Sequence, residues 1–294
     1  MTRRGLVRGA VGFGAIGVAV AAGLLGPRAF NRLSGDECGA TGELPPPSGI
    51  PVRSETLRSR FVEGGSADIA VAVPEGLPAR GAPVCLCLPG RGGRARDVMG
   101  VLRMHDFLAQ GVRERGLRPF ALVAVDSGES YWHRRAGGED RMAFLEQVVI
   151  PHVQRTDGLG ADGAPVLLLG WSMGGYGALL AAERRPDRYR AVAAASPAIW
   201  PSRDEQRSAV PDAFDSDADF ARNDVIAGAA ALQGIPVRVD CGDADPFFPA
   251  ARRLVDALPG RPSASFDTGC HDVGFWRRIA PAQVDFLSRA LSRA

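Results

Sequence analysis

The sequence has almost no excess of charge of either sign. Its 294 residues include 35 Lys and Arg and 33 Asp and Glu, which leaves a formal net charge of +2. Such a balance gives no electrostatic basis for binding nucleic acid. Many arginines stand among acidic residues, a pattern typical of a solvated mixed surface. We therefore expect no nucleic-acid partner.

The sequence also lacks the cysteine and histidine spacings of metal sites. It has no C-x-x-C, and its four histidines and five cysteines do not cluster, so we expect no metal site. Cys85 and Cys87 share one face of an apolar strand, which predicts core packing. Because five is odd, at least one thiol is free or pairs with another chain. The sequence does not decide whether Cys241 and Cys270 form a disulfide, although cysteines on adjacent parallel strands rarely meet disulfide geometry.

Charged residues are missing from Gly9 to Gly26, directly after a positive N-terminus that contains Arg3 and Arg4. A positive region before an apolar one is the layout of an export signal, and the adjacent arginines resemble a twin-arginine signal. No good cleavage site follows, and about 18 residues are just long enough to span a bilayer. We predict that residues 1–30 are either a cleaved signal or an uncleaved membrane anchor, and that the protein is exported.

Two further changes in composition divide the rest of the chain. Residues 31–52 hold three consecutive prolines and several glycines, which predicts a linker. From residue 53 to 294, short apolar runs alternate with amphipathic stretches. This alternation predicts one α/β domain with a mostly parallel central sheet and helices on both faces. The polar, acidic segment 201–226 is either a lid or pocket wall, or a plain surface insertion.

The motif G-x-S-x-G occurs at Gly170-Trp171-Ser172-Met173-Gly174. It follows the apolar run APVLLL and precedes a predicted helix, which is the context the motif requires. A serine on such a sharp turn needs small neighbours two residues before and after it. The N-terminus of the helix favours negative charge near the serine, and the Met173 N–H lies at the same place. The pattern predicts Ser172 as a nucleophile and Met173 as an oxyanion donor.

A second glycine-rich turn, Cys87-Leu-Pro-Gly-Arg-Gly-Gly93, follows another predicted central strand. A hydrolase with a serine nucleophile needs a second backbone N–H that faces the developing oxyanion. Arg91 is the expected donor residue, with Gly92 as the alternative. Because ligands bind at the carboxyl ends of strands in open parallel sheets, this turn and the serine are expected to meet.

A serine nucleophile also needs a histidine base and a carboxylate that fixes the tautomer of the histidine. Asp243 and Asp245 both follow one predicted strand; Asp245 has the usual spacing after it, so we favour Asp245. Of the four histidines, His271 alone comes after both the serine and these acids, in a loop after a strand. The order Ser, Asp, His is the order of α/β-hydrolases.

These motifs carry a resemblance to a known family. GWSMGGYGALLAA, GDADPFF and GCHDVGFWRRIAPAQVDFL resemble the esterase branch of the α/β-hydrolase fold that includes S-formylglutathione hydrolases, feruloyl esterases and mycolyltransferases. The resemblance covers about residues 83–291. It implies a Ser172-Asp245-His271 triad, with oxyanion contacts from the Arg91 region and Met173. The reaction of such a triad requires no cofactor.

The loop 126–142 departs from the family pattern. It follows a predicted strand, so it opens onto the same edge of the sheet. Tyr131, Trp132 and His133, with Arg134, are expected to line an acyl or alcohol pocket, and aromatic residues there suit an apolar or sugar-like substrate. The alternative is that Trp132 packs under the loop as local core.

The sequence thus predicts an exported serine esterase that acts on a small-molecule, lipid or sugar ester. One alternative is an acyltransferase of the same fold, which passes the acyl group to a sugar or lipid alcohol. Another is a non-catalytic cell-envelope binding protein on the same scaffold. The protein would contact a membrane only through its N-terminal segment, if that segment is uncleaved.

Overall fold

The computed structural model describes residues 38–292. The predicted signal or anchor, residues 1–30, lies outside the described residues. No helix in the described part of the chain is long and apolar enough to cross a membrane.

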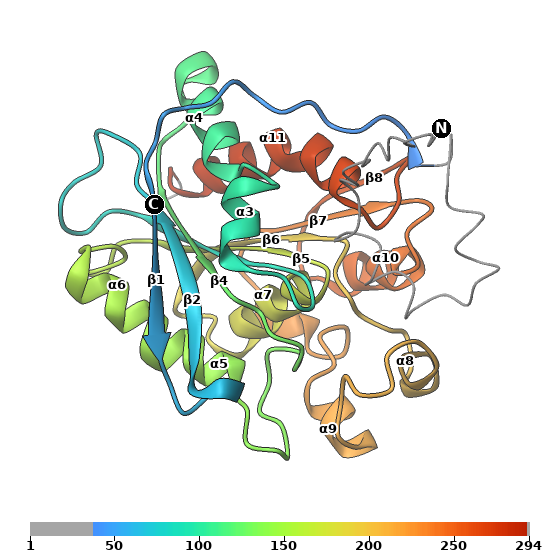
Figure 1. The fold of residues 1–294 in the computed structure, drawn as a ribbon. Helices are drawn as coiled ribbons and strands as arrows, with labels where there is room; N and C mark the ends of the chain where they lie inside the picture. The colour runs from blue at the N-terminus through green and yellow to red at the C-terminus, as the bar shows by residue number, and fades with distance from the viewer. Residues whose placement is uncertain (1–37, 293–294) are drawn as a thin grey trace, which may run out of the picture.

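One eight-stranded sheet forms the centre of the domain (Figure 1). Its strands are β1 (Val52–Arg58), β2 (Ser66–Ala72), β3 (Val84–Leu88), β4 (Ala121–Val125), β5 (Val166–Trp171), β6 (Tyr189–Ala195), β7 (Val237–Gly242) and β8 (Ser263–Asp267). The order across the sheet is β1-β2-β4-β3-β5-β6-β7-β8. Only the β1–β2 and β2–β4 pairings are antiparallel among these strands. The predicted α/β fold with a mostly parallel sheet is confirmed.

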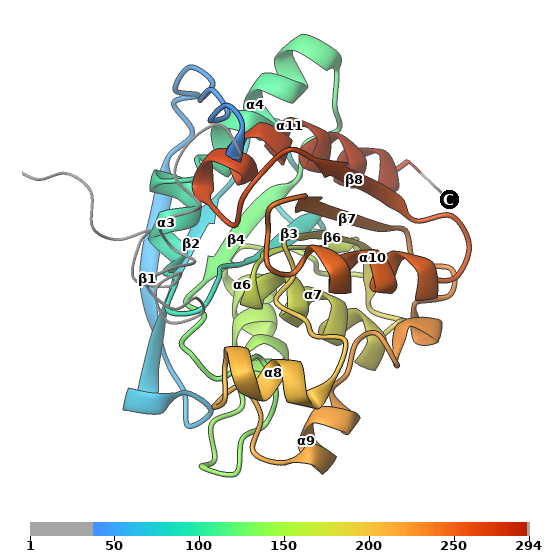
Figure 2. The ribbon, with the colours of Figure 1, turned by 90° about the vertical axis from the view of Figure 1, so that its right-hand side faces the viewer.

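Helices cover both faces of the sheet (Figures 1 and 2). One face packs against α3 (Ala95–Gly100), α4 (Met104–Arg115) and α11 (Val273–Ala290). The other packs against α5 (Arg141–Phe144), the π-helical η3 (Leu145–Val149), α6 (Ile150–Thr156), α7 (Met173–Arg184), the 3₁₀ turn η4 (Ala229–Leu232) and α10 (Phe248–Ala257). A further 3₁₀ turn, η2 (Glu63–Gly65), joins β1 to β2.

The central strands are buried on both faces. Every residue of β3, β4 and β5 is buried, which is why their sequences are continuous apolar runs rather than alternating ones. Cys85 and Cys87 point together into the layer of α11, whereas Leu86 and Leu88 point into the layer of α7. The core role predicted for the two cysteines is therefore confirmed.

The acidic segment 201–226 contains two short helices, α8 (Arg203–Ala209) and α9 (Asp217–Arg222). Each begins after a serine, Ser202 or Ser216, whose side chain accepts a backbone N–H of the first turn, a common helix cap. Figure 2 shows both helices on the far side of α7 from the α11 layer. Buried aromatic side chains attach this segment to the main core.

The described part of the predicted linker is fastened to the domain. Cys38 forms a disulfide with Cys270, and the Gly42 N–H donates to the Gly274 carbonyl at 2.9 Å. The pairing of Cys241 with Cys270 considered from the sequence is therefore wrong, and Cys241 is a free, buried thiol. The partner of Cys270 comes instead from the N-terminal segment, which crosses the end of α11.

Candidate active site

Ser172 lies on the sharp turn between β5 and α7 that its motif predicts. Its backbone has φ 54° and ψ −122°, a conformation that L residues rarely adopt. A Cβ on Gly170 would lie 2.1 Å from the Gly174 carbonyl oxygen, and one on Gly174 would lie 1.8 Å from the Leu88 oxygen. The two glycines are required because the turn brings backbone against backbone on both sides of the serine.

The three predicted triad side chains meet at the carboxyl ends of the strands. The Nε2 atom of His271 is 2.9 Å from the Ser172 Oγ, and its Nδ1 is 2.8 Å from the Asp245 Oδ2. The three residues follow β5, β7 and β8, so the parallel arrangement brings together groups that are 99 and 26 residues apart. This geometry lets the serine proton pass to an imidazole that a carboxylate holds in one tautomer.

The carboxylate of Asp245 is buried and well supplied with donors. Its Oδ1 accepts the Phe247 N–H at 2.9 Å, while Oδ2 faces His271. Burial, the largest influence, raises the pKa of Asp245, but the charge and hydrogen bond of His271, the Phe247 N–H and the Ser196 side chain together outweigh it. The pKa therefore lies below its ordinary value, and the group is a carboxylate at neutral pH.

Asp243, the alternative partner, has a different role. Its Oδ1 accepts the Gly269 N–H at 3.1 Å, and its own N–H donates to the Asp267 carbonyl at 3.0 Å. These bonds link the two loops that follow β7 and β8, so Asp243 caps a backbone amide while Asp245 faces the histidine.

The turn after β3 lies against the serine. A Cβ on Gly90 would be 3.3 Å from the Ser172 Cβ. The Gly92 N–H donates to the Gly128 carbonyl at 2.7 Å, which leaves it unable to bind an oxyanion. The Arg91 N–H makes no backbone hydrogen bond within residues 38–292. Met173 is the first residue of α7, where an N–H has no acceptor in its own helix.

The side chain of Arg91 ties this turn to two other segments. Its Nη2 is 2.5 Å from the Asp212 Oδ2 and 3.2 Å from the Glu129 Oε2. The first acid belongs to the segment between α8 and α9 and the second to the loop after β4. The turn that carries the predicted oxyanion donor is thereby fixed on both sides.

The loop after β4 does not present all its predicted pocket residues to solvent. Trp132 and His133 have no exposed surface, and Tyr131 is 2% exposed. The Trp132 ring fills the space beside Gly177 of α7, where a Cβ would lie 2.4 Å from its Cγ. The pocket role expected for Trp132 and His133 is therefore incorrect, and the local-core alternative holds for Trp132.

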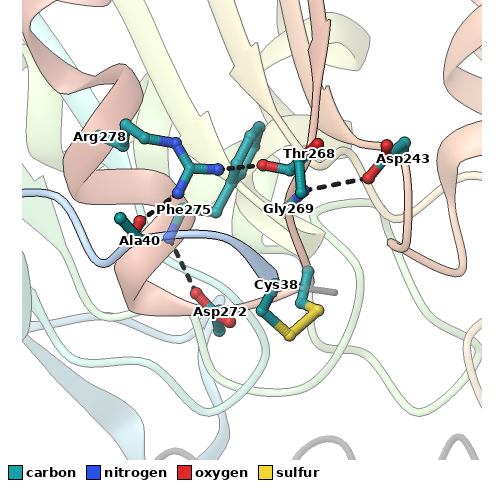
Figure 3. Close-up of a disulfide and its surroundings, with 9 residues drawn as sticks. Cys38, Ala40, Asp243, Thr268, Gly269, Asp272, Phe275 and Arg278 are labelled. Atoms are coloured by element: carbon teal, nitrogen blue, oxygen red, sulfur yellow. Dashed lines mark hydrogen bonds between the residues drawn. A yellow bond between two sulfur atoms is a disulfide. The ribbon is translucent and has the colours of Figure 1, made fainter. Parts of the chain in front are cut away.

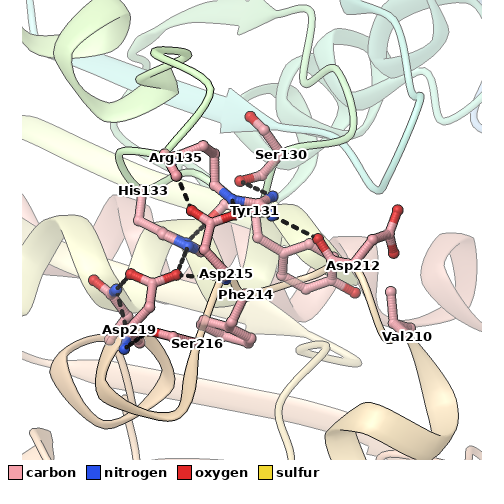
Figure 4. A network of polar contacts seen from close by, with 12 residues as sticks. Ser130, Tyr131, His133, Arg135, Val210, Asp212, Phe214, Asp215, Ser216 and Asp219 are labelled. Atoms are coloured by element: carbon pink, nitrogen blue, oxygen red, sulfur yellow. Dashed lines mark hydrogen bonds and ion pairs between the residues drawn. The ribbon is translucent and has the colours of Figure 1, made fainter.

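His133 instead joins the loop to α9 (Figure 4). Its Nδ1 is 2.7 Å from the Tyr131 carbonyl oxygen and its Nε2 is 3.1 Å from the Asp219 Oδ2. Burial lowers the pKa of His133 more than the nearby carboxylate raises it. A buried ring enclosed between the Tyr131 carbonyl and the Asp219 carboxylate is a structural contact.

Aromatic rings connect this loop to the catalytic histidine. Ring centroids are 5.5 Å apart for Tyr131 and Trp200, 5.6 Å for Trp200 and Phe247, and 5.2 Å for Phe247 and His271. Phe214 from the α8–α9 segment packs on the first two rings. Trp200 and Phe247 were not singled out from the sequence, although both stand in loops directly after a strand, where the site residues also stand.

The described residues contain one cluster of metal-type ligands, Cys38, Cys270 and Asp272. Its two sulfurs are bonded to each other (Figure 3), and a metal binds thiolates rather than a disulfide. The cluster is therefore a covalent link beside His271 and does not offer a metal centre.

Comparisons with known proteins agree with this architecture. The family model described as "Putative esterase" matches residues 63–266. A ferulic acid esterase superposes with a TM-score of 0.69 at 19% identity, over 82% of this chain and 98% of the other. An S-formylglutathione hydrolase from Agrobacterium tumefaciens gives 0.68 at 18% identity, over 84% and 97%.

A third solved structure, MPT51 (FbpC1) of Mycobacterium tuberculosis, gives a TM-score of 0.63 at 18% identity, over 82% of this chain and 99% of that one. No curated protein matches the sequence. The similarities to solved structures show a shared fold, and the family model spans more than two thirds of the sequence. The chain therefore belongs to this esterase family of the α/β-hydrolase fold.

Proposed function

We propose that the protein is a serine hydrolase that cleaves carboxylic esters through an acyl-enzyme. Ser172 attacks the ester carbonyl while His271 takes its proton and then gives it to the departing alcohol. Water repeats the sequence on the acyl-enzyme and releases the acid. The observation that carries this proposal is the continuous chain of hydrogen bonds from Ser172 through His271 to Asp245.

The negative oxygen formed in each step needs fixed donors. The Met173 N–H, at the start of α7, and the Arg91 N–H, in the turn against Ser172, are the two groups we assign to it. Each such donor is worth about 3 kcal/mol of transition-state stabilisation. The ion pairs of the Arg91 side chain hold the second donor in place before substrate arrives.

The aromatic rings beside the histidine favour a substrate with an apolar, aromatic or sugar-like part. Trp200 is 6% exposed and packs edge-on against Phe247, which in turn touches His271. Flat, rigid side chains of this kind bind acyl chains, aromatic acids and sugar rings. We therefore expect a small-molecule, lipid or sugar ester, and the protein needs no cofactor for this reaction.

We also propose that the protein is exported. The disulfide between Cys38 and Cys270 is a bond that forms and persists in oxidising compartments and is rare in the cytosol. It agrees with the twin arginines and the uncharged run at the start of the sequence. We propose that the domain acts outside the cytoplasm, either free or attached by its N-terminal segment.

Labelling with a fluorophosphonate tests the nucleophile. The wild-type protein should become covalently labelled, Ser172→Ala should lose the label, and His271→Ala should label far more slowly. Asp245→Asn should lower kcat by about four orders of magnitude, because the wrong histidine tautomer is then favoured. Asp243→Asn is the matched control and should stay within about tenfold of wild type. Labelling that survives in Ser172→Ala would overturn the assignment.

Transfer to an alcohol uses the same residues, so product analysis decides between hydrolysis and transfer. A p-nitrophenyl ester is incubated with the enzyme in water, with and without added trehalose or glycerol. Free acid as the main product in both reactions supports the esterase. A new acyl-sugar or acyl-glycerol that replaces the acid would make the protein an acyltransferase.

A further inference from the structure

Two serines at the active site have backbone angles that L residues rarely adopt. One is the nucleophile, and the other is Ser196, with φ 46°, directly after β6. Ser196 is fully buried, and its N–H donates to the Asp240 carbonyl at 2.6 Å. Glycine would take this conformation without strain. A strained serine is retained where its side chain has a task that the surrounding structure supports.

The hydroxyl of Ser196 lies between Trp276 and the triad. The Nε1–H of Trp276 donates to the Ser196 Oγ at 3.1 Å, and the Ser196 hydroxyl lowers the pKa of the Asp245 carboxyl, which places the hydroxyl beside that group. A hydroxyl has one proton to donate and two acceptor positions. Because the indole N–H occupies an acceptor position, the serine proton is free to point at the carboxylate, which can only accept.

Trp276 also touches the base itself. Its ring stands edge-on to His271, with centroids 5.3 Å apart and planes at 82°. It belongs to the first turn of α11, which begins two residues after the histidine. One side chain therefore supports the imidazole through its ring and supports the carboxylate through Ser196.

The Ser196 hydroxyl differs in kind from the titratable side chains that contact Asp245. The titratable side chains in contact with it among the described residues are His271, from the loop before α11, and Cys241, from β7. Burial raises the pKa of the Cys241 thiol, so the thiol stays neutral. Ser196 is then the hydroxyl donor that sets the orientation and the effective charge of the carboxylate.

We propose that Ser196 and Trp276 are positioning residues for the hydrolysis reaction, with Trp276 aligning the Ser196 hydroxyl and Ser196 holding Asp245 toward His271. This inference rests on the proposed function. The donor dipole of Ser196 also weakens the attraction between the carboxylate and a protonated imidazole. Removal of the Ser196 hydroxyl therefore stabilises the protonated form of His271. Because His271 acts as a base only when it is neutral, the reaction then needs a higher pH.

The test measures kcat/KM against pH for hydrolysis of p-nitrophenyl acetate. Ser196→Ala should lower kcat about tenfold, because a hydrogen bond to a charged group is lost. The acid limb of its pH profile should shift to higher pH by about half a unit. Ser196→Gly should show the same kinetic change even though it relieves the backbone strain. Trp276→Phe should move both quantities less and in the same direction.

A double variant separates a relay from two independent contacts. If Trp276 acts through Ser196, the double variant Ser196→Ala with Trp276→Phe should have its acid limb at the same pH as Ser196→Ala alone. Ser288→Ala is the control, because Ser288 is a buried serine near the other end of α11 that accepts the Arg118 N–H. It should leave kcat and the acid limb unchanged. Thermal unfolding of each variant confirms that it folds.

Three results would overturn the inference. They are an unmoved acid limb in Ser196→Ala, wild-type kinetics in Ser196→Gly, and independent, additive shifts in the double variant. All three results are interpreted only after fluorophosphonate has been shown to label the wild-type enzyme at Ser172. An unlabelled wild-type protein contradicts the proposed function instead, so the two failures are distinguishable.

Discussion

Cys38 is bonded through its sulfur to Cys270, the residue directly before His271. The bond spans a sequence separation of 232 residues. The Arg278 side chain reinforces it by donating to the carbonyls of Ala40 and Thr268 on the two joined segments (Figure 3). The loop that carries the base is therefore fixed by a segment from the opposite end of the chain.

Removal of this disulfide should destabilise the domain. Cys38→Ser with Cys270→Ser should lower the free energy of unfolding by about 4 kcal/mol, since the bond closes a very long loop in the unfolded chain. Urea unfolding with and without a reductant measures the loss. The reductant should destabilise the wild type and leave the double variant unchanged. Equal stability of the oxidised and reduced wild type would contradict the prediction.

The glycines around Ser172 should tolerate no side chain. Gly170→Ala and Gly174→Ala place a Cβ within 2.1 Å or less of a backbone oxygen, so we expect these variants to unfold or to lose the turn and all labelling. Gly100→Ala is the matched control at the end of α3, where a Cβ meets nothing within 4 Å. It should be neutral or stabilising by about 0.5 kcal/mol. Soluble yield and thermal unfolding provide the comparison.

The parts of the site that were predictable from sequence are those whose geometry is local. The turn at Ser172 needs glycines two residues on either side, so a short motif contains its geometry. The position of His271 followed from chain order. The spacing after the strand favoured Asp245 over Asp243, and the tertiary arrangement shows that Asp245 faces the imidazole while Asp243 accepts a backbone N–H.

The incorrect expectations concern contacts between distant segments. Cys38 stands in a Pro- and Gly-rich stretch that looked like a linker, so no local signal marked it as the partner of Cys270. Trp132 and His133 stand in a polar loop at a strand end, which favoured a pocket role. Their burial depends on Gly177 and Asp219, and neither contact has a signature in the sequence.

The contact between His133 and α9 gives a third prediction. Asp219 is buried and also accepts the Asp215 N–H at 3.0 Å and the Asn223 Nδ2–H at 3.0 Å. Asp219→Ala removes the side-chain acceptor of these contacts, two of which are buried, and should lower the free energy of unfolding by about 2 to 3 kcal/mol. Asp217→Ala is the control on the same helix, because its side chain is 72% exposed.

The control should change stability little, since exposed ion pairs contribute little. Urea unfolding of both variants gives the two numbers. Equal stability of the two variants would show that the network in Figure 4 does not hold the α8–α9 segment in place.

Glu183 should make the domain less stable as the pH rises. Glu183 belongs to α7; its carboxylate lies against Gly228, and its Oε1 is buried without a hydrogen-bond partner among the described residues. Burial first, and then the nearby charge of Asp224, raise the pKa of Glu183 to about 8. The unfolded chain loses this proton near pH 4.5, so between these values the native state binds more protons than the unfolded state.

Stability therefore falls as the pH rises from about 4.5 to about 8 and levels off above that, because ionisation is easier in the unfolded chain. Glu183→Gln removes the titration and should raise the free energy of unfolding at pH 8 by about 2 kcal/mol relative to wild type, with little difference at pH 4.5. Glu114→Gln, on the exposed face of α4, is the control and should follow the wild-type curve. Urea unfolding from pH 4.5 to 9 measures all three proteins, and parallel curves for wild type and Glu183→Gln would mean that this carboxyl does not titrate differently on folding.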